Sequence, residues 1–157
     1  MIVFNKMADV AFYHLQQSHL EEALPRLLEH TLNAGKRALV RACSVDRLTS
    51  ISSALWTQYS DNWLPHGTEK DGSAEDQPIW LTTDAANPNG ATFIFLVDGV
   101  EAEDLGNFER CFDLFDGNDA GSVMAARKRW KSVKEAGHEL HYWRQNEHGK
   151  WEETGKQ

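Results

Sequence analysis

Residues 8–43 read ADVAFYHLQQSHLEEALPRLLEHTLNAGKRALVRAC, and this stretch predicts the fold class. Its first part, 8–15, is a short apolar run with two aromatic residues, which is typical of a β-strand. Residues 19–34 place leucines at helical spacing and are followed by Gly35, which predicts a helix and its end. Residues 37–43 form a second apolar run. Strand, helix and strand with short connections favour a right-handed parallel crossover and therefore an α/β sheet.

The same alternation continues to residue 144. Further helices are predicted at 45–58 and 119–136, and further strands at 78–83, 92–97, 110–115 and 139–144. The 92–97 run, TFIFLV, is the most hydrophobic and is expected at the centre of the sheet. We therefore predict one α/β domain over 1–157, with a mostly parallel Rossmann-like sheet flanked by helices. Its core spans 8–144, and 145–157 is expected to be a C-terminal tail.

Composition and charge argue against several classes of function. The 157 residues carry a net charge of -8, which disfavours broad contact with a nucleic-acid backbone, so no tight direct binding of single-stranded DNA is expected. No apolar run reaches the ~20 residues of a membrane span, and MIVFNK does not resemble a signal peptide. Cys43 and Cys111 lie in apolar stretches and are expected to be buried, reduced thiols. A cytoplasmic protein without a cofactor is expected.

Motifs for catalysis are scarce in this sequence. Neither a GxxxxGK[ST] nor a GxGxxG phosphate loop occurs. Asp98 and Asp116 each follow an apolar strand and precede glycine, so they form turns or, alternatively, the metal site of a phosphotransfer enzyme or nuclease. His138 and His141 are three apart in a predicted strand and should face opposite sides, so no metal site is predicted.

A cationic helix segment is the first candidate binding surface. Residues 126–134, ARKRWKSVK, hold five basic residues and no acid. Arg127, Lys131 and Lys134 share one helix face with Trp130 beside them, which suits a peptide with acidic residues and an apolar anchor. The structural alternative is that the cations favour the helix dipole and that Trp130 packs on the sheet. That alternative accounts for Lys131 and Lys134 but leaves Arg127, Lys128 and Arg129 in mid-helix unexplained.

Aromatic residues around the second helix form the other candidate surface. Trp56 ends the predicted helix 45–58, and Trp63 and Leu64 precede Pro65, which breaks regular structure. Burial in the core is an equal alternative for Trp56. Exposure of Trp63 and Leu64 beside the turn would mark a partner site, because Trp is enriched in interface hot spots.

Taken in order, these segments resemble the chi subunit of bacterial DNA polymerase III. The resemblance runs from residue 8 to about 144 and is carried by ADVAFYHL, GKRALVRA, LW with WLPHG, QPIWLT, NPNGATFIFLVDG, and FDGND followed by ARKRWKSVKEAGHELHYW. It implies a single α/β domain without enzymatic activity that belongs to the clamp-loader complex. The C-terminal RQNEHGKWEETGKQ extends past the family's usual end, and the basic cluster is denser than usual.

The resemblance also implies two partners. One surface would hold psi, the small subunit that connects to the clamp loader, and it corresponds to Trp56, Trp63, Leu64 and Pro65. A second surface would hold the acidic C-terminal tail of the single-stranded-DNA-binding protein, which ends in an aromatic residue. The family's arginine and aromatic for that tail correspond to Arg127 and Trp130, and Lys131 and Lys134 continue the row.

Overall fold

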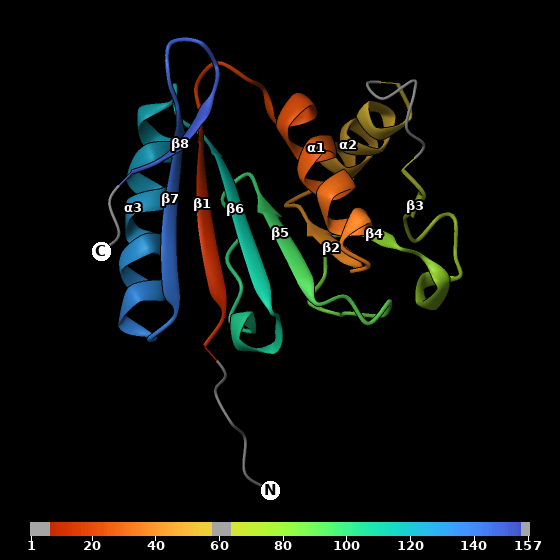
Figure 1. Cartoon of the computed structure of the whole chain (residues 1–157). Helices are drawn as coiled ribbons and strands as arrows, with labels where there is room; N and C mark the ends of the chain where they lie inside the picture. Colours follow the sequence, from red (N-terminus) through yellow and green to blue (C-terminus); the bar gives the residue numbers. More distant parts are fainter. Residues whose placement is uncertain (1–6, 58–63, 155–157) are drawn as a thin grey trace, which may run out of the picture.

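A computed structural model describes residues 7–57 and 64–154 (Figure 1). The elements are β1 Asp9–Leu15, α1 Leu20–Asn33, β2 Ala38–Arg41, α2 Val45–Thr57, β3 His66–Gly67, β4 Ile79–Thr82, β5 Phe93–Val97, β6 Arg110–Asp116, α3 Ala120–Glu135, β7 Glu139–Gln145 and β8 Trp151–Glu153. Two single-turn 3₁₀ helices lie at Ala74–Asp76 and Leu105–Asn107. No helix in these described ranges is long and apolar enough to cross a membrane.

One sheet joins all the described strands in the order β3-β4-β2-β5-β6-β1-β7-β8. Every pairing is parallel except that of β7 with β8. The predicted α/β class and mostly parallel sheet are confirmed, and β5 occupies a central position as expected. The opening strand–helix–strand unit does not join neighbours, because β6 and β5 lie between β1 and β2.

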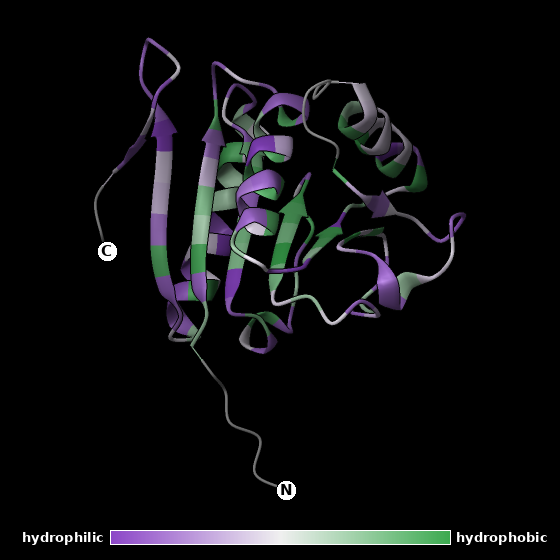
Figure 2. Cartoon of the chain, turned by 45° about the vertical axis from the view of Figure 1, so that its right-hand side comes forward, coloured by the Kyte–Doolittle hydropathy of each residue, from purple (hydrophilic) through white to green (hydrophobic). Residues whose placement is uncertain are grey.

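Two cores form on the two faces of the sheet. On one face, leucines of α1 and α2 pack on Val40, Phe95 and Leu114. On the other, Ala126, Trp130 and Val133 of α3 pack against the apolar side chains of β1, β5 and β6. Figure 2 shows the central strands as hydrophobic and the β7–β8 hairpin loop as hydrophilic. The α3 helix is thereby held against β6, β1 and β7, and this position determines what its outer face can bind.

Local polar contacts explain where two helices begin. The Ser44 hydroxyl accepts a hydrogen bond from the Arg47 backbone nitrogen at 3.2 Å and caps α2. The Asp119 carboxylate accepts bonds from the Ser122 nitrogen at 2.9 Å and hydroxyl at 2.8 Å and caps α3. These bonds lower the pKa of Asp119 and align the helix that carries the basic segment.

Two expectations differ from the structure. The segment predicted to be a C-terminal tail continues the sheet, because Gln145 ends β7 and β8 returns antiparallel to it. Trp151 of β8 packs edge-on against Tyr13 at 5.1 Å, which covers part of the β1 surface. Cys43 is exposed rather than buried, since β2 ends two residues earlier, whereas Cys111 is buried as expected.

Candidate functional site: the outer face of α3

Arg129 is the member of the basic segment that faces inward. Its guanidinium donates to Asp113 of β6 through Nε at 2.7 Å and Nη2 at 3.0 Å, and both side chains are more than nine-tenths buried. Burial raises the pKa of the Asp113 carboxyl, and the two charge-assisted bonds from Arg129 oppose that rise. Arg129 therefore has a structural role that the sequence alone did not reveal.

Trp130 serves both the core and the surface. Its ring lies edge-on to Phe12 of β1 at 5.3 Å and to Tyr142 of β7 at 5.6 Å. The side chain is half-buried, so packing on the sheet, which was the structural alternative, is confirmed. The exposed remainder of the indole lies on the helix face that also carries Arg127, because the two are three residues apart.

A second arginine approaches the same place from the sheet. Arg144 of β7 pairs in register with His14 of β1, and Tyr142 projects from the same face of β7. The His14 Nδ1 and the Tyr142 hydroxyl share a 2.6 Å hydrogen bond. We call Arg127, Trp130, Tyr142, Arg144 and His14 the basic corner.

Electrostatics in the basic corner show that its two arginines act on common neighbours. Burial lowers the pKa of His14, and the positive charges of Arg144 and Arg127 lower it further. Burial raises the pKa of Tyr142, and the same two arginines oppose that rise. Two guanidinium groups near a phenol and an uncharged imidazole form an environment that favours an incoming carboxylate.

The cations on this face have no acidic partner among the residues that the structure describes. In residues 7–57 and 64–154, no carboxylate lies within 4.0 Å of the charged group of Arg127, Lys131, Lys134 or Arg144. All four residues are exposed. The chain has 24 acidic residues against 16 basic ones, so a row of unpaired cations is unexpected and leaves this face free to bind an anion.

Sequence reasoning identified Arg127, Trp130, Lys131 and Lys134 but missed the contribution of the sheet. A usable signal was present: alternate residues of a strand share a face, so Tyr142 and Arg144 had to project together from the predicted strand 139–144. That β7 lies beside β1, under α3, was not accessible from the sequence. The pairing of distant strands brings His14 and Arg144 together.

The second candidate surface, around the end of α2, contains both exposed and buried residues. Trp56 is exposed at 58%, and its ring tilts against that of His66 at 5.0 Å. Leu64 is only 2% exposed, so its expected exposure is wrong: the side chain belongs to the core beneath α1 and α2. Pro65 is half-buried, and Trp63 lies outside the described residues.

Trp56 borders a surface hollow of about 610 Å³ between α2 and residues 68–71. At the other end of α2, Val45 is 57% exposed, and Thr49 and Ser52 lie between it and Trp56 on the same helix face. An exposed aromatic and an exposed valine separated by small side chains form a shallow apolar groove.

Asp98 and Asp116, the alternative metal pair, are engaged otherwise. The Asp98 carboxylate accepts a 2.6 Å bond from Nε of Arg47, and the Asp116 carboxylate accepts from the Asn118 nitrogen at 2.9 Å. A guanidinium already neutralises the first carboxylate, which disfavours a divalent cation there. Gly117 is needed because a Cβ would lie 1.9 Å from the His14 ring. The turn interpretation fits both places.

The two histidines near β7 also separate as predicted. His138 lies before the strand, where its Nδ1 accepts a bond from the Ala8 nitrogen at 3.0 Å. His141 faces away from the basic corner and contacts Asp9, Glu139 and Glu153. The Glu153 hydrogen bond and the Asp9 contact raise the pKa of His141, while burial opposes them. No sequence motif marked this group, because its members come from three strands.

Comparison with known proteins identifies the family. Residues 7–141 match the family model described as DNA polymerase III chi subunit, HolC. A protein of Rickettsia prowazekii (strain Madrid E) named "Probable DNA polymerase III subunit chi" is 25% identical over 95 residues. That alignment covers 60% of this chain and 58% of the Rickettsia protein. The family match spans most of the chain, including β1, α3 and the start of β7, and we conclude that this chain belongs to the DNA polymerase III chi subunit family.

Proposed function

We propose that this protein is a non-catalytic accessory subunit of the polymerase III clamp-loader complex, in the cytoplasm. It would link the clamp loader, through psi or an equivalent subunit, to the acidic C-terminal tail of single-stranded-DNA-binding protein. The observation that carries the proposal is the outer face of α3, where exposed cations flank a half-buried tryptophan and have no acidic partner in residues 7–57 and 64–154.

The basic corner suits the end of an acidic peptide. Arg127 offers a planar fork that can bind a carboxylate through two parallel hydrogen bonds, and Arg144 supplies a second guanidinium from the sheet. The aromatic side chain of the tail would pack against Trp130 and Tyr142, whose rings already contact each other at 5.6 Å. Lys131 and Lys134 would attract acidic residues further along the peptide by weaker, salt-screened forces.

The groove on α2 suits the other partner. Trp56 and Val45 are among the few large hydrophobic side chains that are exposed in the described residues, and both lie on α2. An amphipathic segment could bury these two side chains against its own apolar face. The groove lies on α2, and the basic corner lies where α3 covers β1 and β7. The two helices pack on opposite faces of the sheet. One domain could therefore hold both partners at once.

A peptide titration tests the proposal. A labelled acidic peptide ending in an aromatic residue should bind the wild-type protein, and Arg127→Ala should lose roughly 2 kcal/mol or more of binding energy. A peptide without its terminal aromatic residue should bind more weakly, whereas a single-stranded oligonucleotide should not bind tightly at physiological salt. Equal affinities of wild type and Arg127→Ala for the full peptide would remove α3 as the tail site.

A further inference from the structure

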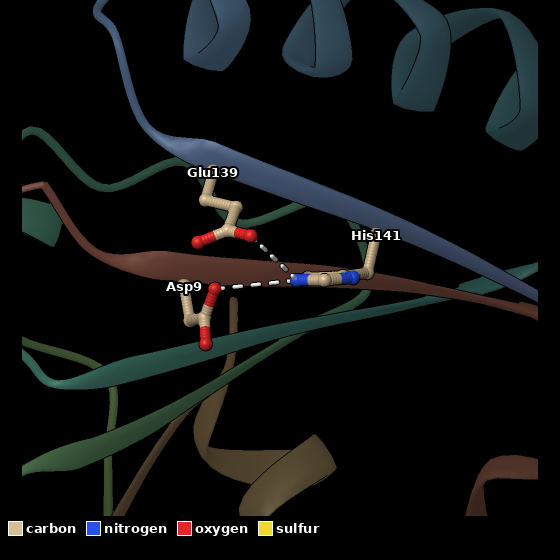
Figure 3. A group of neighbouring side chains, drawn as sticks. All are labelled: Asp9, Glu139 and His141. Carbon is tan, nitrogen blue, oxygen red and sulfur yellow. Dashed lines mark hydrogen bonds and ion pairs between the residues drawn. The ribbon is translucent and has the colours of Figure 1, made fainter. Parts of the chain in front are cut away.

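A group of metal-ligating side chains lies on the opposite face of β7 from the basic corner. Asp9 of β1 pairs in register with Glu139 of β7, and His141 follows Glu139 by two residues, so it projects from the same face. The Nε2 atom of His141 lies 3.2 Å from Oδ1 of Asp9 and 3.9 Å from Oε1 of Glu139 (Figure 3). One ligand atom from each of the three residues lies within 4.8 Å of the others.

The imidazole is held in the orientation that a metal ligand needs. Its Nδ1 forms a 2.6 Å hydrogen bond with Oε1 of Glu153 on β8, which points Nε2 toward Asp9 and Glu139. A carboxylate on the far nitrogen is the arrangement that fixes the ring of metal-bound histidines. Ala11 is the β1 partner of His141 and has a small side chain. Figure 3 shows the ring of His141 directed toward Asp9.

Distances and charge fit a small divalent ion. Bonds of ~2.0–2.1 Å in a tetrahedral site place neighbouring ligand atoms roughly 3.3 Å apart, close to the His141–Asp9 separation. The Glu139 carboxylate must move about half an ångström closer to Nε2 of His141, and its side chain is 60% exposed. Three carboxylates surround this one imidazole, so the group carries excess negative charge even when the ring is protonated.

We propose that Asp9, Glu139 and His141 bind a divalent transition-metal ion of the Zn²⁺ class, with Glu153 as a positioning residue. One imidazole and two carboxylates favour Zn²⁺ over Mg²⁺ or Ca²⁺, which prefer oxygen ligands alone. By the usual order of affinities, Mn²⁺ should bind most weakly of the first-row divalent ions, and Cu²⁺ should bind more tightly than Zn²⁺. The bound ion would join β1 to β7 directly and β8 through Glu153, and so would fasten the C-terminal hairpin to the sheet.

Titration of ZnCl₂ into the full chain, tag-free and chelator-treated, tests this site. All variants should carry Cys43→Ser, because the exposed Cys43 thiol could bind zinc separately. Calorimetry should give one site per chain. Asp9→Asn and His141→Gln should each weaken it at least tenfold, and Glu153→Gln should weaken it about tenfold, in the range for residues that orient a metal ligand.

The controls separate a metal site from a salt-bridged hairpin. His148→Gln removes another histidine that lies beside a glutamate, at 3.5 Å, and should leave zinc affinity unchanged. Asp9→Asn keeps the size of a side chain that is 39% exposed, so its metal-free melting temperature should stay close to that of the wild type. Equal zinc affinities of the Cys43→Ser protein with and without Asp9→Asn, or binding by the Cys43→Ser protein only at millimolar zinc, would overturn the proposal. Peptide binding at the basic corner should be unaffected, so the two proposals can fail independently.

Discussion

Arg129 and Arg127 lie two residues apart on α3, yet they belong to different environments. Arg129 is directed into the sheet, where its Nε and Nη2 atoms donate hydrogen bonds to the carboxylate of Asp113. Arg127 is exposed and has no carboxylate within ion-pair distance in the described ranges. A run of basic residues in a sequence can therefore combine a buried structural cation with exposed cations. The side of the helix on which each lies decides its role.

The largest effect that this comparison predicts is on stability. Arg129→Met should lower the free energy of unfolding by ~3–5 kcal/mol, because it leaves Asp113 charged, buried and without its partner. Arg127→Met should stay within about 0.5 kcal/mol of the wild type, as expected for an exposed site. Urea unfolding followed by circular dichroism measures both. Similar losses in the two variants would abolish the distinction between the faces.

The pH dependence of Arg129→Met sharpens the test. Burial raises the pKa of Asp113, and removing Arg129 takes away the main opposing interaction. A carboxyl with a raised folded-state pKa destabilises the protein above that pKa, and its penalty disappears below the unfolded-state pKa. The stability deficit should therefore be greatest at neutral pH and shrink toward pH ~4. A deficit that grows on acidification would contradict this assignment.

The region around the end of α2 provides a second inner-and-outer pair. Leu64→Ala removes a side chain that is 2% exposed and should cost ~2–5 kcal/mol of stability. Trp56→Ala removes one that is 58% exposed, so it should change stability by less than about 1 kcal/mol while weakening association with the clamp-loader partner. Thermal melts and a pull-down with that partner would separate the two. A large melting shift for Trp56→Ala would assign it to the core.

Sequence patterns predicted the helices and strands better than they predicted which strands pair in the sheet. Apolar runs marked the longer strands because a strand buried on both faces needs continuous hydrophobicity. The three-residue β8, WEE, carries no such run, and its pairing with β7 depends on a hairpin that packs Trp151 on Tyr13. Strand order was not predictable from local patterns either, since β1 pairs with β6 and β7, whose residues lie more than a hundred positions away.

The residues of the candidate site were predictable where they share one helix and not where they depend on a contact with the sheet. Helical spacing sufficed to group Arg127, Trp130 and Lys131, because residues three and four apart always share a face. Helical spacing could not distinguish Arg129, whose structural role depends on its contact with Asp113 of β6. The tail-binding role of this face stays a prediction until it is measured, and the sheet residues of the basic corner offer the next test.

Arg144→Ala should weaken binding of the acidic peptide by about 1 kcal/mol, as expected for an exposed ion pair. This is less than the loss for Arg127→Ala, because Arg127 lies beside Trp130 on α3, where the end of the peptide is expected. Arg26→Ala on α1 is a matched exposed-arginine control and should leave the affinity unchanged. Fluorescence anisotropy at constant ionic strength measures all three variants. Wild-type affinity in Arg144→Ala would confine the site to α3 alone.

Lys134→Ala should produce the smallest effect, a few tenths of a kcal/mol at physiological salt. Lys134 lies two helical turns from Arg127 and is exposed. Its attraction to acidic residues of the peptide passes through solvent, so added salt screens it and it decays over about one Debye length. Its loss should therefore appear mainly as a flatter dependence of affinity on salt concentration, whereas Arg127→Ala should lower affinity at every salt concentration. Titrations at low and high salt distinguish these two behaviours. If the two variants lose the same amount at high salt, then the row acts as a uniform patch of charge, and the special position of Arg127 beside Trp130 has no energetic meaning.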